Sequence, residues 1–256
     1  MLALFFIVLA ASDTTFGLSC ITNCSIEKIP FDQELRIPDG KCLQRESLPT
    51  CYIDVLFNYQ SRTYDVNLPD TTAPRDTILI SSESALVYTM SRECSEETDC
   101  VLTETRKGIR ELTSRSYDAM AIYKEIAPII KTATQSNPVK CFDMSNGTET
   151  CASDDICKVE YDRIVPSVRI RGCTSYNSIQ VYVYDSPTYT SFDINCNRDF
   201  CNSDNTFDQI KNILIKNNLV DANGRIPAIA GSHSLLPSLL LMFFAMQSRA
   251  IVLLRA

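Results

Sequence analysis

The sequence has few of the residues on which most catalytic and metal sites depend. Its 256 residues include no tryptophan, seven glycines and a single histidine, His233. That histidine lies in a C-terminal segment that we expect to be removed, so the mature chain would lack histidine for Ser-His-Asp or Cys-His catalysis. No Cys-x-x-Cys pair supports a zinc site. No glycine-rich stretch suits a phosphate-binding loop.

Positive charge is also scarce. The formal net charge of −7 and the isoelectric point near 4.8 argue against a nucleic acid or an anionic lipid surface as partner. A site made of carboxylates alone, as in glycosidases, stays open at Asp154-Asp155 and at Glu96-Glu97. Because neighbouring side chains in a strand or turn diverge, we interpret both pairs as solvated loop charges. We therefore expect a non-enzymatic protein with no cofactor and no metal.

The chain opens with a short apolar run, Met1 to Ala11. About ten residues are too few to span a bilayer and are typical of a signal-peptide core. Small residues favour cleavage after Gly17, which makes residues 1–17 the signal peptide. Cleavage after Ser12, or a buried N-terminal strand or helix, is the alternative.

Cysteine, by contrast, is abundant. All twelve cysteines lie between Cys20 and Cys201, so an even number stays in the mature chain. Together with export, an even set predicts a disulfide framework formed in an oxidising compartment. The count alone does not give the pairing.

Apolar and polar residues alternate between the later cysteines. Three segments show this pattern, at residues 158–162, 168–171 and 179–184, and they are bounded by Pro, Gly, Ser and Asp. Alternation with a period of two, bounded by turn residues, predicts half-buried strands joined by turns.

The stretch that holds these strands resembles the three-finger domains of the lymphocyte-antigen-6/urokinase-receptor family. The residues that carry the resemblance are Cys141, Cys151, Cys157, Cys173, Cys196, Cys201 and Asn202. In that family, long β-fingers leave a disulfide-bonded palm, and the domain ends in a short loop closed by Cys…Cys-Asn. The chain departs from the pattern in lacking the extra disulfide of the first finger and the doubled Cys-Cys near the end.

The resemblance implies a small all-β, disulfide-rich fold of three-finger (snake-toxin-like) modules with short helical tails. It also implies the pairs Cys141–Cys157, Cys151–Cys173 and Cys196–Cys201. A more divergent copy of the same pattern precedes it, for which family-like pairing would be Cys20–Cys51, Cys24–Cys42 and Cys94–Cys100. We expect two modules in tandem with no disulfide between them; one larger irregular domain is the alternative.

A helix-like segment follows each copy. Apolar residues recur with helical spacing from Tyr117 to Ile126, where Pro128 is expected to end the helix, and again from Phe207 to Leu214. Each helix either packs on its own module or serves as a spacer; a helix that binds a membrane surface or a partner is the sharper alternative. The predicted organisation is a module at 18–104, a helical linker at 105–138, a module at 139–203 and a helical stalk at 204–222.

Two glycosylation sequons occur, Asn23-Cys-Ser and Asn146-Gly-Thr. The second falls at the expected tip of the first finger of the second module. The first has a cysteine at its middle position, next to an expected disulfide, and an unmodified asparagine is the alternative there.

The C-terminus carries the pattern of a glycosylphosphatidylinositol (GPI) signal. Small residues at Ala222-Asn223-Gly224 are followed by a spacer and by an apolar tail from Leu235, which Arg249 interrupts too early for a good transmembrane helix. Members of the resembled family are commonly anchored in this way. We expect lipid attachment at Ala222, removal of residues 223–256 and a place on the outer leaflet of the plasma membrane.

These features predict a GPI-anchored surface glycoprotein whose fingers bind an extracellular receptor, channel or secreted ligand. The predicted binding face consists of Arg169, Arg171, Tyr182 and Tyr184, at polar-facing strand positions. Tyrosine and arginine are over-represented among binding hot spots. A structural or adhesive coat protein without one specific partner is the alternative function.

Overall fold

A computed structural model describes residues 17–95, 100–132, 138–162, 167–176 and 178–229. The predicted signal peptide up to residue 16, Glu96-Glu97 and the apolar C-terminal tail with His233 lie outside these residues. The strands are β1 Leu18–Ile21, β2 Cys24–Pro30, β3 Arg45–Leu48, β4 Cys51–Asn58, β5 Thr63–Leu68, β6 Arg75–Ser81, β7 Val87–Cys94, β8 Lys140–Phe142, β9 Thr148–Thr150, β10 Ile156–Asp162, β11 Ser167–Thr174, β12 Gln180–Asp185 and β13 Thr190–Cys196. The helices are α1 Cys100–Ser114, α2 Ala119–Ile130 and α3 Asp204–Lys216.

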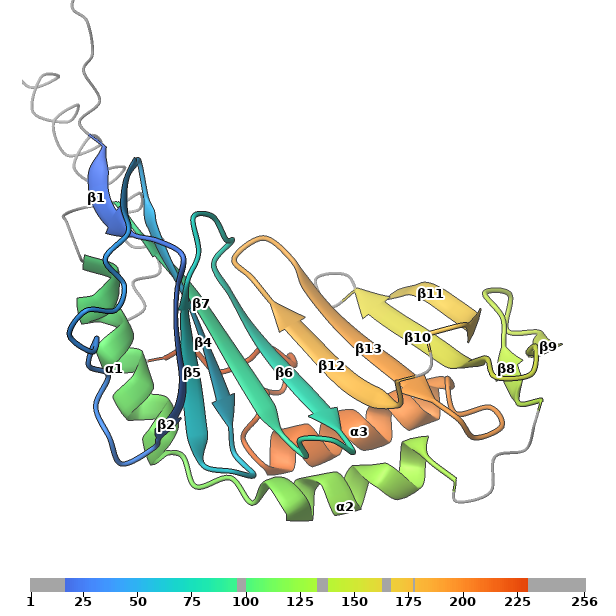
Figure 1. Ribbon diagram of the computed structural model, residues 1–256. Coiled ribbons are helices and arrows are strands. Elements are labelled where there is room, and N and C mark those ends of the chain that lie inside the picture. The colour runs from blue at the N-terminus through green and yellow to red at the C-terminus, as the bar shows by residue number, and fades with distance from the viewer. Residues whose placement is uncertain (1–16, 96–99, 133–137, 163–166, 177, 230–256) are drawn as a thin grey trace, which may run out of the picture.

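Nine of the strands form one antiparallel sheet in the order β11-β10-β13-β12-β6-β7-β4-β5-β2 (Figure 1). Strands β1 with β3 and β8 with β9 form two small additional sheets. The first half of the chain supplies β2 and β4 to β7, and the second half supplies β10 to β13. The halves meet where β12 pairs with β6, in a register that places Val181 opposite Ile80 and Val183 opposite Ile78. The two cysteine-rich segments therefore share one continuous sheet.

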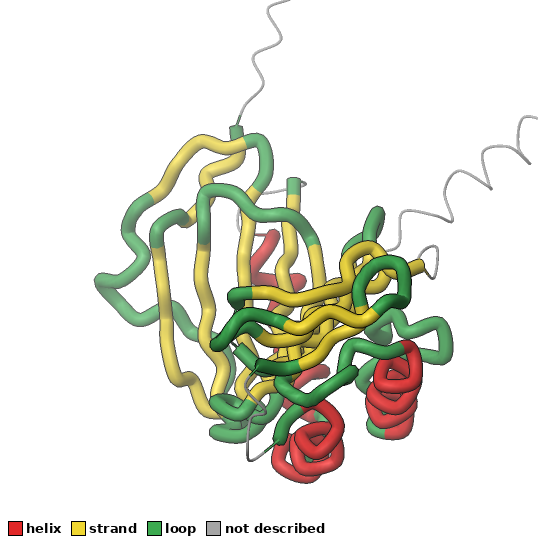
Figure 2. The backbone as a smooth tube through the Cα atoms, turned by 90° about the vertical axis from the view of Figure 1, so that its right-hand side faces the viewer, coloured by secondary structure: helices red, strands yellow, loops and turns green. Residues whose placement is uncertain are grey.

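The three helices lie against one face of this sheet, and within the described part of the chain no helix covers the other face (Figures 1 and 2). Buried residues on the helix side alternate with more exposed ones along β4, β10 and β12, as the sequence pattern predicts for β10 and β12. The fully buried side chains include Ile53, Val55, Phe57, Tyr64, Ile78, Ile80, Val159, Val181, Val183, Phe192 and Ile194. A single apolar core thus runs beneath both halves of the sheet.

Six disulfides join all twelve cysteines. The pairs are Cys20–Cys51, Cys24–Cys42, Cys94–Cys100, Cys141–Cys157, Cys151–Cys173 and Cys196–Cys201. These are the pairs that the resemblance implies, and none joins the first six cysteines to the last six. The chain is mostly β-sheet with a few helices and is rich in disulfides; the connection between its halves is hydrogen-bonded and apolar.

Helix α1 is a part of the first half that the cysteine spacing did not predict. It begins at Cys100, inside the segment assigned to the first module, and packs against β4 and β7. The Tyr59 hydroxyl donates a hydrogen bond of 2.8 Å to the carbonyl oxygen of Leu112. Gly108 allows the close approach, because a Cβ atom there would lie 2.6 Å from the sulfur of Met90. Contact with the sheet therefore offsets the usual cost of a mid-helix glycine.

Helix α2 extends beyond its predicted end at Pro128. Pro128 lies inside the helix, which continues to Ile130. The Ile130 side chain is 1% exposed, and its carbonyl oxygen accepts a hydrogen bond of 3.0 Å from the Asn197 N–H. These tertiary contacts hold the last turn in place despite the proline. Helix α2 packs on α3 and β13, so the helix that follows the first half covers the second half.

Helix α3 packs on the sheet and is not a free stalk. Ser203 caps its first turn by accepting a hydrogen bond from the Thr206 N–H, and Ile210 and Leu214 are fully buried. The rings of Phe192 and Phe207 meet edge to face with centroids 4.9 Å apart. The predicted apolar face from Phe207 to Leu214 is thus the face that contacts the core.

The chain after α3 crosses the helix side of the molecule toward α1 (Figure 1). We call residues 219–229 the C-terminal strap. Four of its apolar side chains are at most 5% exposed, namely Leu219, Val220, Ile226 and Ile229. Ile229 lies next to Gly108 of α1, because a Cβ atom on Gly108 would be 3.8 Å from the Ile229 Cγ2 atom. The strap therefore touches both halves.

Two buried carboxylates face each other where the halves meet. Asp185 of β12 lies opposite Asp76 of β6 in the register, and burial raises the pKa of both carboxyl groups. Each has its own cation: Arg92 binds Asp76 at 3.0 Å, and Arg225 of the strap binds Asp185 at 2.8 Å. The Ile226 N–H also donates to Asp185 Oδ2 at 2.8 Å. Contacts from β7 and from the strap thus compensate the two carboxylates.

Because the two halves share one core, we expect a core substitution in one half to destabilise both. We expect Phe192→Ala to lower the free energy of unfolding by about 3–5 kcal/mol, because the ring is fully buried. Hydrogen exchange should show lower protection in β4 and β7 as well as in β12 and β13. The exposed Tyr176 provides the control, and Tyr176→Ala should change stability by no more than about 0.5 kcal/mol. Loss of protection confined to β10–β13 would contradict a single cooperative unit.

Candidate functional site

The candidate site lies on the uncovered face of β10 to β13. On these strands Val159, Val181 and Ile194 point to the helix side, so their neighbours point away from it. We call the following set the open face: Lys158, Glu160, Arg169, Tyr182, Tyr184, Tyr189 and Asp193. It combines aromatic rings with charges of both signs.

The centre of the open face lies on three neighbouring strands, β10, β13 and β12. Glu160 of β10 lies directly opposite Asp193 of β13, which in turn lies opposite Tyr182 of β12. Like charges directly opposite each other in a sheet are destabilising. Such a pair needs compensation from its surroundings.

Glu160 has that compensation. Its carboxylate binds the Arg169 guanidinium at 2.9 Å and the Lys158 ammonium at 3.5 Å, and it accepts a hydrogen bond of 3.2 Å from the Tyr189 hydroxyl. The side chain of Glu160 is 12% exposed. Two cations and one hydroxyl thus contact this carboxylate.

Asp193 is less well compensated. Burial, reinforced by the nearby Glu160 carboxylate, raises its pKa to about 6, while Lys158, the Ser191 hydroxyl and Arg169 oppose the rise. Within the described part of the chain, its Oδ1 atom is buried and has no hydrogen-bond partner. Asp193 is the one open-face carboxylate that gains from a further cation or hydrogen-bond donor.

The aromatic side chains surround these carboxylates. The Tyr184 and Tyr189 ring centroids lie 5.9 Å apart, and the Arg169 guanidinium lies 5.1 Å from the Tyr189 centroid. Burial raises the pKa of the Tyr182 hydroxyl. On the neighbouring strand, Ile170 lies opposite Glu160 and is 46% exposed. The face therefore offers apolar contact area beside its charges.

Arg171 was predicted to belong to this face, and that prediction is wrong. A register shift between Glu160 and Tyr161 reverses the alternation along β11, so Ile170 is exposed and Arg171 points to the helix side. The Arg171 side chain is 4% exposed and binds Asp204 at the start of α3. The Tyr161 hydroxyl donates to the same carboxylate at 2.7 Å, and this bond, followed by Arg171, lowers the pKa of Asp204.

Both sequon asparagines are exposed in turns. Asn146 lies between β8 and β9, and its side-chain oxygen accepts a hydrogen bond from Arg171. A glycan is linked through the amide nitrogen, so this bond leaves the linkage atom available. Asn23 lies between β1 and β2, next to Cys24. Ala222, the predicted lipid-attachment residue, lies in an exposed turn at the start of the strap.

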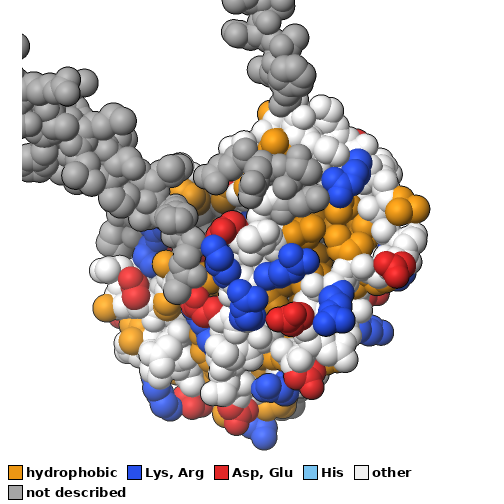
Figure 3. All heavy atoms as spheres, turned by 90° about the vertical axis from the view of Figure 1, so that its left-hand side faces the viewer, with side chains coloured by type: hydrophobic (Ala, Val, Ile, Leu, Met, Phe, Trp, Pro, Cys, Tyr) orange, Lys and Arg blue, Asp and Glu red, His pale blue; other side chains and the backbone are white. Residues whose placement is uncertain are grey.

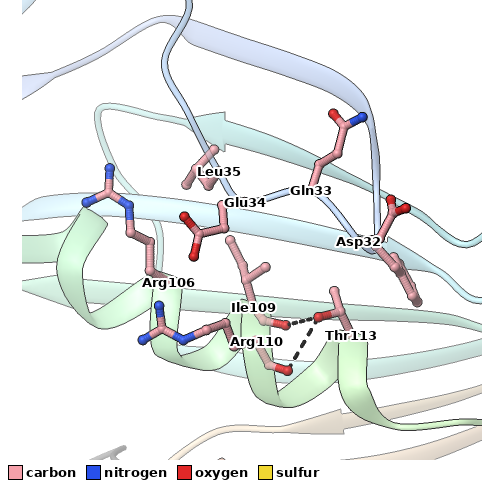
Figure 4. A pocket seen from close by; sticks show the side chains of 9 residues that line it. Asp32, Gln33, Glu34, Leu35, Arg106, Ile109, Arg110 and Thr113 are labelled. Carbon is pink, nitrogen blue, oxygen red and sulfur yellow. Dashed lines mark hydrogen bonds between the residues drawn. The ribbon is translucent and has the colours of Figure 1, made fainter.

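A second candidate surface lies at the end of the molecule that carries α1. Figure 3 shows apolar surface there between lysine and arginine side chains. The cavity in this region has a volume of about 150 Å³ and lies between α1 and residues 31–35 (Figure 4). Arg106 and Arg110 line it from α1, and Glu34 from the loop. Sites for small ligands usually enclose about 300–1,000 Å³, so this cavity is too small for one.

Three cysteine sulfurs, those of Cys141, Cys151 and Cys173, lie within 4.8 Å of one another. They belong to the two neighbouring disulfides Cys141–Cys157 and Cys151–Cys173, so they are not thiolates and offer no metal ligand. Among the described residues, no helix has both the length and the apolar character needed to cross a bilayer.

Comparison with protein-family models gives no match to this chain, and comparison with curated proteins gives none either. The assignment of a function therefore depends on the site itself.

Four residues of the open face were missed in the sequence, namely Lys158, Glu160, Tyr189 and Asp193. Asp193 lies in β13, a strand that was not predicted. The alternation of Phe192, Ile194 and Cys196 with polar residues could have revealed this strand. Glu160 lies in a predicted strand, but its pairing with Asp193 depends on a neighbour more than thirty residues away in the sequence. Tyr189 lies in the turn after β12, where no periodic pattern applies.

Replacement of each of the two arginines of β11 should lower the stability of the protein by clearly different amounts. We expect Arg171→Ala to destabilise the protein by about 1–3 kcal/mol, because it removes a buried donor from Asp204, Tyr161 and Asn146. Arg169→Ala should cost less than about 1 kcal/mol, because its ion pair is partly exposed. Chemical unfolding measures both. Equal losses would contradict the different placement of the two side chains.

Asp193 should make stability depend on pH. Its folded pKa of about 6 exceeds its value in the unfolded chain, so the folded state binds more protons between about pH 4 and 6. The contribution of Asp193 to stability therefore falls as the pH rises through this window. We expect Asp193→Asn to remove that slope and to stabilise the protein at pH 7.4 more than at pH 4. A carboxyl resonance that titrates near pH 4 in NMR would contradict the prediction.

Proposed function

We propose that this protein is a GPI-anchored cell-surface glycoprotein of the three-finger type that binds an extracellular or membrane protein through its open face. The observation that carries the proposal is the cluster of tyrosines, cations and one under-compensated carboxylate on an uncovered sheet. Tyrosine and arginine are the residue types that contribute most at protein interfaces. The export signal, the sequons and the C-terminal signal in the sequence support a place on the outer leaflet.

The three-finger assignment is supported by the role of Asn202 as well as by the disulfides. Asn202 is fully buried after Cys201. Its amide nitrogen donates to the carbonyl oxygens of Phe142 at 2.8 Å and Lys158 at 3.2 Å, and its oxygen accepts from the Phe142 N–H at 2.9 Å. One side chain thus joins β8 to β10 at the disulfide-bonded end. This explains physically why a Cys-Asn ending suits such a module.

The chemistry of the open face indicates a partner with a basic group. Lys158, Arg169 and Tyr189 already bind Glu160, whereas Asp193 Oδ1 has no partner within the described residues. A lysine or arginine of the partner placed over this face would lie near the Asp193 carboxylate and stabilise its charged form, and Tyr182 would contact its alkyl stem. Ile170 and Tyr184 would then cover the apolar part of the partner.

A glycan at Asn146 is compatible with this binding mode. The asparagine contacts Arg171, which lies on the helix side, so the glycan starts away from Tyr182 and Tyr184. A protein attached only to the outer leaflet has no cytoplasmic part, so any signal must pass through a partner that spans the membrane.

The proposal predicts saturable binding of the labelled ectodomain to cells or to captured surface proteins. We expect Tyr182→Ala and Tyr184→Ala each to weaken this binding by about 30-fold, the effect of losing about 2 kcal/mol at a hot spot. Affinity should also fall from pH 7.4 to pH 5.5, because protonation of Asp193 removes the anion that faces the partner's cation.

Tyr176 is the matched control, since it is an exposed tyrosine outside the strands. Tyr176→Ala should bind normally. If no saturable partner is found and the protein only clusters with itself, the alternative function as an adhesive coat protein is favoured. If a partner binds the two tyrosine variants as tightly as it binds the unchanged protein, the open face is not the site.

A further inference from the structure

The C-terminal strap, residues 219–229, is a part of the fold and not a spacer beside it. After the exposed turn at Ala222, the chain returns to the core through Ile226 and Ile229, which are 5% and 4% exposed. The turn itself is hydrogen-bonded, because the Asp221 N–H donates to the Arg225 carbonyl oxygen at 2.8 Å and the Arg225 N–H donates to Asp221 Oδ1 at 2.8 Å. The residues on both sides of Ala222 are thus held together.

Removal of the residues after Ala222 would damage the centre of the molecule. Asp185 would lose the Arg225 guanidinium and the Ile226 N–H, and would remain buried opposite Asp76. A buried carboxylate without its cation is strongly destabilising. The loss of Ile229 would also uncover Gly108 of α1, in the other half of the chain. Cleavage at this position is therefore incompatible with the packing of the strap.

We infer that the mature protein keeps the strap through Ile229 and that the GPI lipid is attached beyond it, at Ala230. This inference rests on the proposed anchoring. In the sequence, Ala230-Gly231-Ser232 is a second run of three small residues, as an attachment site requires. Four residues separate Ala230 from Leu235, where the apolar tail begins, and eight separate it from Leu239, where the part of the tail without proline or serine begins. The second distance matches the spacer of such signals.

The covalent step is a transamidation. The ethanolamine amine of the lipid attacks the carbonyl carbon of Ala230, the Ala230–Gly231 peptide bond breaks, and a new amide forms. A proton passes from the attacking amine to the α-amine of the released segment 231–256. The step needs no oxidant or reductant, and it leaves Arg225, Ile226 and Ile229 in the mature chain.

The C-terminal peptide of the mature protein decides between the two positions. The protein is released from intact cells by phosphatidylinositol-specific phospholipase C, digested with trypsin and analysed by mass spectrometry. Trypsin cuts after Lys216 and Arg225. We expect an unmodified peptide 217–225 and a lipid-remnant peptide 226–230. A lipid-remnant peptide 217–222 would overturn the inference and leave the anchoring itself intact.

Failure of the phospholipase to release the protein, with residues after Leu239 still attached, would defeat the anchoring and this inference together. Two variants give an independent test. Ala222→Leu changes an exposed side chain, so the variant should fold, reach the surface and be released as before. Replacement of Ala230, Gly231 and Ser232 by leucine should abolish lipid-anchored display. The opposite result, with loss of display in Ala222→Leu alone, would place the anchor at Ala222.

Discussion

The pairing of β6 with β12 is the constraint on which the rest of the structure depends. It joins two disulfide-bonded halves into one sheet although no disulfide connects them, and it brings Asp76 and Asp185 face to face beneath that sheet. Two buried carboxylates so close are tolerable only with a cation for each. Those cations come from β7 and from the C-terminal strap, so the junction holds the chain's last described segment in place.

The same pairing sets the extent of the open face. Tyr182 lies opposite Leu79, and Tyr184 lies opposite Thr77, so the surface of the second half continues onto a strand of the first. A free second module would end at β12 and expose the backbone groups of an unpaired edge there. Burial of that edge in the shared sheet fixes the positions of the two tyrosines. Rigid aromatic side chains suit recognition because little conformational entropy is lost when they bind.

The sequence predicted the strands and helices that depend on residues close together along the chain. Alternation located β10, β11 and β12, and helical spacing located α3. The sequence did not predict the features that depend on residues distant in the chain. Helix α2 continues past Pro128 because Ile130 is buried and its carbonyl oxygen is hydrogen-bonded to Asn197. Helix α1 tolerates Gly108 because Met90 lies against it. Arg171 shows the limit most clearly. One extra residue in β11 turned it to the helix side, and that shift is set by the pairing with β10 and not by the residues of β11.

The ends of the described chain suggest how the open face is presented. The strap leaves the fold beside Gly108 of α1, at the end of the sheet formed by the first half (Figure 1). The open face lies on β10 to β13, in the other half and on the opposite side of the sheet from the helices. The lipid tether that we propose beyond the strap would therefore leave the first half of the sheet between the membrane and the tyrosines. Because the halves share one core, a shared sheet and not a flexible stalk would keep that distance in the proposed arrangement, which would favour a partner that reaches the same height above the membrane.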